Sequence, residues 1–175
     1  MEFILITAQT GNHPTYSPKV IAEFLFTHLE QYGDKTEDIL KCIDYVMNPS
    51  KGGTIVVGLD ENRIVGVVIL NNTGMKDYIP ENILVYIAVD NSLRGKGYGK
   101  KLMQKAIDST SGSIALHVEP DNPAFHLYKK FGHNLDELKK RLVFTTHTPE
   151  EAGNEKHDIY FLQNLSFFCG LPMEE

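Results

Sequence analysis

The stretch ILVYIAVDNSLRGKGYGKKLM, residues 83–103, decides the fold. Its first seven residues form an apolar run, which is typical of a strand buried on both faces of a sheet. Glycine then occupies every second position from Gly95 to Gly99, and residues with helical spacing follow. The stretch therefore predicts a buried strand that ends in a tight turn, with a helix starting directly after it.

A turn of this kind can bind phosphate. The first amides of a helix have no partner within the helix, and the helix dipole places about half a positive charge there. No acidic residue lies between Asp90 and Asp108, although the whole chain has a net charge of −6. The basic residues in this interval are Arg94, Lys96, Lys100, Lys101 and Lys105. A solvated, lysine-rich helix face is the alternative interpretation of the same residues.

Two common phosphate loops do not fit these glycine positions. A P-loop that ended in Gly99-Lys100 would need glycine at position 94, where the chain has Arg94. A dinucleotide-binding fingerprint that began at Gly95 would need glycine at position 100, which is a lysine. The glycines therefore indicate a phosphate site of another type, or a simple turn.

The rest of the chain alternates between predicted strands and helices. Helices are predicted to start at Pro18 after a Ser17 cap, behind a Thr36 cap, at Gly97 and behind an Asn122 cap. Strands are predicted over residues 3–8, 54–59, 63–70, 83–89, 113–118, 141–147 and 158–164. This order is that of a mixed α/β protein. Because no linker divides it, residues 1–175 are expected to form one domain.

Composition and charge restrict the function. The net acidic charge argues against general nucleic-acid binding. The longest apolar run, residues 83–89, is too short to span a membrane, and the first residues lack the positive region of a signal peptide. The two cysteines, Cys42 and Cys169, form neither a CxxC pair nor a metal-binding spacing. We therefore expect a cytoplasmic protein with no metal, no nucleic-acid partner and no membrane partner.

Two motifs together resemble one family. Residues Arg94–Gly99 match the pattern [Q/R]-x-x-G-x-[G/A], and the segment IALHVEPDNPAFHLYKKFGH, residues 114–133, is similar to a strand and helix that follow this pattern in the GCN5-related N-acetyltransferase superfamily. The downstream residues that match are Asn122, Ala124, Leu127, Tyr128 and Gly132. Because both motifs occur in the right order and at the right distance, the chain resembles that superfamily over residues 83–133.

The resemblance implies a single acetyltransferase domain of mixed α/β (α+β) type. Its central, mostly antiparallel mixed sheet would splay between strands four and five and would be flanked by helices. The resemblance also implies acetyl-CoA as cosubstrate, with its pyrophosphate on the amides of the turn and its pantetheine arm along the fourth strand. The residues implied to bind the coenzyme are Ile87, Ala88, Val89, Arg94, Gly95, Lys96, Gly97, Tyr98, Gly99, Lys100 and Asn122.

The resemblance further implies transfer of an acetyl group to a primary amine of a small molecule or peptide, with Tyr128 as the general acid for the departing thiolate. A lysine-like amine has a pKa of about 10.4, so a base or a water chain must remove its proton. Some members carry a glutamate early on the fourth strand, where this chain has Ile83. The candidate bases are Glu81 and His117, with Tyr86 and Glu119 as further options, and a water relay would need none of them.

Other interpretations stay open. From position alone, Tyr128 is a core residue on an apolar stripe and Asn122 is a plain helix cap. The chain could bind acetyl-CoA as a non-catalytic regulatory or interaction module, or it could bind another nucleotide phosphate. The family's Gly-Phe pair becomes Gly132-His133 here, and residues 134–157 depart from the family pattern, so the acceptor is not predicted. The apolar residues 165–173 would cover the core or a partner copy, which makes a homodimer one option.

Overall fold

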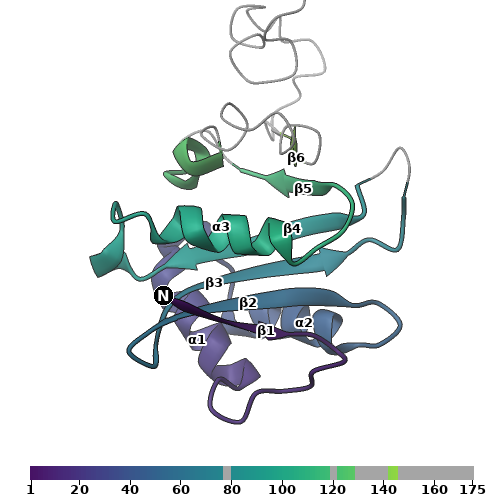
Figure 1. Ribbon diagram of the computed structural model, residues 1–175, viewed down its shortest axis with the longest axis horizontal. Coiled ribbons are helices and arrows are strands. Elements are labelled where there is room, and N and C mark those ends of the chain that lie inside the picture. Colours follow the sequence, from purple (N-terminus) through teal and green to yellow (C-terminus); the bar gives the residue numbers. More distant parts are fainter. Residues whose placement is uncertain (77–79, 119–121, 129–141, 146–175) are drawn as a thin grey trace, which may run out of the picture.

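The structure is a computed structural model that describes residues 1–76, 80–118, 122–128 and the backbone of 142–145 (Figure 1). In chain order the elements are β1 (Glu2–Ile6), α1 (Pro18–Leu29), the 3₁₀ helix η1 (Glu30–Tyr32), α2 (Thr36–Met47), β2 (Gly53–Asp60), β3 (Arg63–Asn72), β4 (Asn82–Val89), the 3₁₀ helix η2 (Asn91–Leu93), α3 (Tyr98–Asp108), β5 (Ile114–His117) and β6 (Leu142–Thr145). Residues 124–128 are also helical.

One sheet carries the fold, with its strands in the order β1-β2-β3-β4-β5-β6. Strands β1 to β4 pair with one another in antiparallel fashion, whereas β5 is parallel to both β4 and β6. Helix α3 lies on one face and helices α1 and α2 lie on the other, as Figure 1 shows, and each face has its own apolar core. The predicted fold, a mixed α/β domain with a mostly antiparallel sheet, is confirmed.

A bulge in β4 changes which residues face each core. Leu84 pairs with Leu70 of β3, whereas Tyr86 pairs with Ile69, so Val85 is an extra residue in β4. Such an insertion reverses the alternation of side chains along a strand. Leu84 therefore packs in the α3 core and Tyr86 packs in the core under α1 and α2.

The sheet opens directly after the bulge. Pairing between β4 and β5 covers only Asn82–Leu84 against Ile114–Leu116, although β4 continues to Val89. In the part of the chain that the structure describes, no strand pairs with the β5 side of β4 beyond Leu84. The predicted splay between the fourth and fifth strands is therefore present, and it leaves backbone amides and carbonyls without strand partners.

The prediction that residues 83–89 are buried on both faces is wrong. Ile83 is 43% exposed and Val85 is 37% exposed. Both side chains lie where β4 leaves β5, and both line the cleft described below. An apolar run of this length predicts a strand covered on both faces, but here some of its side chains line the opening between β4 and β5.

The predicted helix starts agree with the structure to within one residue, with α3 starting at Tyr98 and Gly97 at its cap position, but one predicted cap is wrong. The Ser17 side chain accepts a hydrogen bond from the Val20 amide at 3.5 Å and Pro18 is the first residue of α1, as expected. The prediction that Thr36 caps the second helix is wrong, because Lys35 holds the cap position without a side-chain bond and Thr36 is already helical. The Lys35 carbonyl accepts bonds from the amides of Asp38 and Ile39, so the first turn closes on the backbone alone.

Several predictions cannot be compared with the structure. The predicted strand over 141–147 corresponds to β6. The strand predicted over 158–164, the segment 134–157 apart from β6, and the apolar residues 165–173 lie outside the described residues.

Among the helices that the structure does describe, none combines the length and the apolar character that a membrane crossing needs.

Two paired glycines let α3 lie close to the sheet. Gly58 of β2 pairs with Gly66 of β3, and the fully buried Leu102 of α3 packs against both. A methyl group at Gly66 would overlap Leu102 and would lie 3.0 Å from the Ala88 carbonyl oxygen. At Gly58 it would meet mainly the end of the Met1 side chain, which can move away.

We predict that Gly66→Ala lowers the free energy of unfolding by about 1–3 kcal/mol, because overpacking a closed core forces helix and sheet apart. Gly58→Ala is the matched control, and its loss is expected to be clearly smaller. Urea unfolding followed by circular dichroism measures both values. Equal losses in the two variants would mean that α3 does not depend on Gly66 for its close approach.

Candidate active site

The opening between β4 and β5 leads into a cleft of about 880 Å³. One wall is β4 itself, from Ile83 to Val89. The second is the turn and first residues of α3, and the third is the segment from the end of α1 to Asp34. The lining is completed by His117 and Val118, by Asn122 and Pro123, and by residues 124 and 126–128 of the following helix. The cleft therefore joins segments from both halves of the described chain.

The glycine turn has the geometry of an anion site. Gly95 and Gly97 have φ values of 79° and 84°, a left-handed conformation that favours glycine, and a side chain at either position would point into open space. Gly97 is the residue before the first turn of α3, and the first helical bond runs from the Lys101 amide to the Gly97 carbonyl at 3.2 Å. The amides of Tyr98, Gly99 and Lys100 precede that bond and have no acceptor within the helix.

Gly99 has a different role in packing. A methyl group there would lie 3.3 Å from Leu127, so glycine lets α3 and the 124–128 helix approach each other. Tyr98 donates a hydrogen bond from its hydroxyl to Asp60 at 2.9 Å, and this bond raises the pKa of the Tyr98 hydroxyl. Lys100 lines the cleft, whereas Lys96 is exposed and is not among the lining residues.

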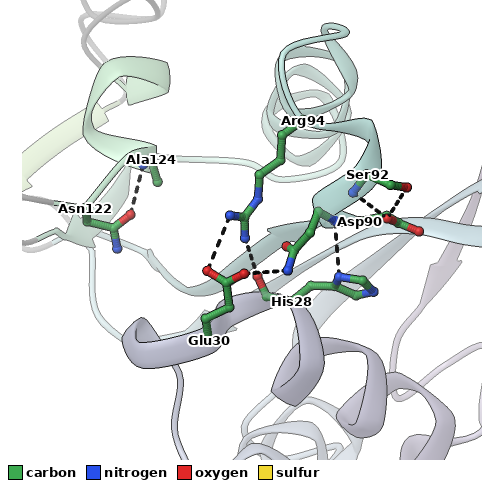
Figure 2. Close-up of polar contacts among 8 residues, drawn as sticks. His28, Glu30, Asp90, Ser92, Arg94, Asn122 and Ala124 are labelled. Carbon is green, nitrogen blue, oxygen red and sulfur yellow. Dashed lines mark hydrogen bonds and ion pairs between the residues drawn. The ribbon is translucent and has the colours of Figure 1, made fainter.

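The turn is tied to the end of α1 by Arg94 (Figure 2). The Arg94 guanidinium donates to the His28 carbonyl at 2.6 Å and forms an ion pair with Glu30 at 3.5 Å. The Asn91 amide donates to Nδ1 of His28 at 3.2 Å. The Arg94 side chain is therefore occupied by protein groups, and its role here is to hold the turn against α1.

Asn122 precedes the helical residues 124–128 beside the cleft, and Tyr128 is one of these residues. The Asn122 carboxamide oxygen accepts a hydrogen bond from the Ala124 amide at 2.9 Å, which is the expected helix cap (Figure 2). Tyr128 is only 3% exposed, packs in the α3 core and still lines the cleft. Burial raises the pKa of its hydroxyl, which keeps the proton on the oxygen.

The candidate bases lie in different places. His117, at the end of β5, is exposed and lines the cleft. Glu81 precedes β4 and is not among the lining residues, and its carboxylate accepts hydrogen bonds from the amide and hydroxyl of Ser113 at 2.6 and 2.7 Å. Glu119 lies outside the described residues. The structure thus brings His117, but not Glu81, to the same cleft as Tyr128.

The three backbone positions predicted to bind coenzyme lie on the part of β4 that does not pair with β5. Ile87, Ala88 and Val89 line the cleft and pair on their other side with Val68, Val67 and Gly66 of β3. Of the residues predicted to bind coenzyme, all except Lys96 line the cleft.

One feature of the site was not predicted from sequence. The Tyr86 hydroxyl donates a hydrogen bond to Asp34 at 2.5 Å, and both residues line the cleft. Burial and the Asp34 carboxylate raise the pKa of the Tyr86 hydroxyl. The two residues are 52 positions apart, and Asp34 sits in a polar segment between helices, so no local pattern indicates the contact.

Comparison of the sequence with known proteins finds a matching family model and a curated relative. The family model described as the acetyltransferase (GNAT) family matches residues 17–133, about two thirds of the chain. An uncharacterized protein of Methanocaldococcus jannaschii is 30% identical over 96 residues, which is 53% of this chain and 17% of that protein. The chain therefore spans about a sixth of the length of the curated relative it matches.

Solved structures share the fold. A probable acetyltransferase has a TM-score of 0.58 and 19% identity, with 78% of this chain and 91% of that chain covered. A ribosomal-protein-alanine N-acetyltransferase from Brucella melitensis biovar Abortus has a TM-score of 0.51 and 17% identity, with 77% and 92% covered. An aminoglycoside N-acetyltransferase in complex with CoA has a TM-score of 0.53 and 12% identity, with 74% and 84% covered.

Proposed function

The chain belongs to the GNAT acetyltransferase family, and from this premise we propose that it transfers the acetyl group of acetyl-CoA to a primary amine of a small molecule or peptide. One observation carries the proposal. The unpaired edge of β4 runs directly into the glycine turn of α3, and Tyr128 lies in the same cleft. The cleft would therefore offer the unpaired edge of β4 to the pantetheine arm of acetyl-CoA, the glycine turn to its pyrophosphate, and Tyr128 to the departing thiolate.

The residues present fit acetyl-CoA. The unpaired amides and carbonyls of residues 85–89 can bond an extended amide-bearing arm as an added strand would. The open backbone at Gly95 and Gly97 and the free first amides of α3 suit a pyrophosphate. Lys100 adds a positive charge to the lining. When bound, acetyl-CoA supplies an acetyl group activated as a thioester.

Transfer forms a carbon–nitrogen bond to the acceptor and breaks the carbon–sulfur bond of the thioester. The amine loses one proton and the departing thiolate gains one. Tyr128 is the proposed donor of the second proton, because its buried hydroxyl stays protonated and lines the cleft. His117 or a water chain is the proposed route for the first, because the Glu81 carboxylate is bonded to Ser113 away from the lining residues.

The alternative is a module that binds acetyl-CoA without turnover. A thiol-release assay with acetyl-CoA and a panel of acceptors separates the two functions. The panel contains simple primary amines, peptides with a free amino terminus, an aminoglycoside, an alcohol and a thiol. We expect release with at least one amine and none with the alcohol or thiol. Tight coenzyme binding with no release by any acceptor would instead support the binding module.

We predict that Gly97→Ala weakens acetyl-CoA binding at least roughly tenfold by calorimetry, a change of about 1.4 kcal/mol. A side chain at a φ of 84° strains the turn and narrows the approach to the first amides of α3. Gly74→Ala is the matched control, because Gly74 also has a positive φ, of 72°, and open space around it, but does not line the cleft. Both variants should lose similar stability, and an undiminished affinity in Gly97→Ala would refute the pyrophosphate site.

We predict that Tyr128→Phe lowers kcat by roughly 10²- to 10⁴-fold and leaves coenzyme affinity nearly unchanged. Phenylalanine keeps the buried ring and removes the proton donor. Tyr16→Phe is the control, since it removes another buried tyrosine's hydroxyl, which bonds the Asn62 carbonyl at 2.9 Å outside the cleft lining. Turnover of the Tyr128 variant at the parent rate would make Tyr128 a packing residue only.

A further inference from the structure

We propose that the carboxylate of Asp34 binds a second positive charge on the acceptor, so that the preferred substrates are amines with another cationic group a few bonds from the nitrogen that reacts. This inference rests on the proposed function and names its substrate class. It begins from Asp34 and Tyr86, which the coenzyme and proton-transfer assignments leave unused.

Tyr86 fixes the position of Asp34. Only 8% of Tyr86 is exposed, the residue packs in the core under α1 and α2, and its hydroxyl donates a hydrogen bond to one carboxylate oxygen of Asp34, Oδ2. Within the described residues, the other oxygen, Oδ1, has no hydrogen-bond donor and Asp34 has no ion pair. A carboxylate held in this way presents one oxygen to a ligand in the cleft, and a carboxylate oxygen forms its strongest hydrogen bonds with a charged donor.

Two carboxylates close to Asp34 in the chain are already paired. Glu30 pairs with Arg94 at 3.5 Å, and Asp38 pairs with Lys41 at 2.7 Å. The cations that line the cleft, Arg94 and Lys100, belong to the glycine turn and the start of α3. Among the described residues, the lining therefore has its lysine and arginine side chains at the proposed phosphate site and an acid without an ion pair, Asp34, on the wall formed by the segment after α1.

Asp34 with Tyr86 and the proposed acid Tyr128 lie on opposite sides of the sheet. The bulge at Val85 directs Tyr86 into the core under α1 and α2, whereas Tyr128 packs in the core under α3. A group bound at Asp34 would thus reach the opening in the sheet from the face opposite to Tyr128. Asn71, the register partner of Ile83, bonds Cys42 of α2, so Ile83 faces the same side as Tyr86. The exposed Ile83 side chain offers an apolar surface for the alkyl chain of such an acceptor.

The charge at Asp34 suits a second cation better than the nitrogen that reacts. An opposite charge nearby stabilises the protonated form of an amine, which would oppose the deprotonation that acetyl transfer needs. A cation held at Asp34 while a different nitrogen reaches the thioester gains the attraction without that cost. Diamines and basic amino acid derivatives have this chemistry.

Steady-state kinetics with two matched acceptors tests the proposal. The acceptors are 1,5-diaminopentane and n-pentylamine, which share chain length and the reacting group. The parent enzyme should have a KM for the diamine about tenfold or more below that for the monoamine, the range of one charge-assisted hydrogen bond. Asp34→Asn should remove this preference through the KM of the diamine, with kcat and the monoamine values almost unchanged.

Two further variants separate charge from structure. Tyr86→Phe keeps the carboxylate charge and should retain most of the diamine preference. Asp38→Asn removes a carboxylate that Lys41 already pairs and should change nothing. The proposal is overturned if the parent enzyme acetylates both amines with equal KM, or if Asp34→Asn affects both acceptors alike. If neither amine, nor any other, is acetylated, the proposed function fails and this inference falls with it.

Discussion

The separation of β4 from β5 is the constraint on which the rest of the site depends. A sheet normally satisfies the amides and carbonyls of every inner strand. Here the pairing stops at Leu84, and five more residues of β4 continue without a partner on that side. An edge inside a sheet is more protected than an outer edge, because cores on both faces hold it in place. It can therefore serve as a fixed template for an extended ligand.

The bulge at Val85 adds a second consequence. One extra residue places Leu84 and Tyr86 on opposite faces, although they are two positions apart. The opening then has one chemical group from each side: the buried Tyr128 hydroxyl from the α3 face and the Tyr86–Asp34 pair from the other. Arg94 holds the glycine turn against the end of α1, and the chain continues from there to Asp34. The glycine turn and the Asp34 segment are therefore linked through Arg94. The cleft thus has two approaches, one from each face, that meet where β4 and β5 separate.

The local parts of this arrangement could be predicted from sequence. The strand over 83–89, the glycine turn, the inward residues of α3 and the Asn122 cap all follow from patterns within a few residues. The family resemblance implies the splay, which the structure shows, and a coenzyme site along it, which stays a prediction. What sequence did not indicate depends on long-range pairing: the bulge exists only against Ile69 and Leu70 of β3. The exposure of Ile83 and Val85 belongs to the place where β4 leaves β5. The Asp34–Tyr86 contact is likewise set by how α2 packs on the sheet.

Hydrogen exchange of the backbone amides, measured with and without acetyl-CoA, tests the central claim most directly. Exchange should become slower on coenzyme binding at those amides of residues 85–89 that do not bond β3, and at Tyr98, Gly99 and Lys100. The amides shared between β1 and β2 should keep their rates. Coenzyme binding that leaves the β4 amides unchanged and protects residues elsewhere would contradict the claim that the open edge of β4 is the binding template.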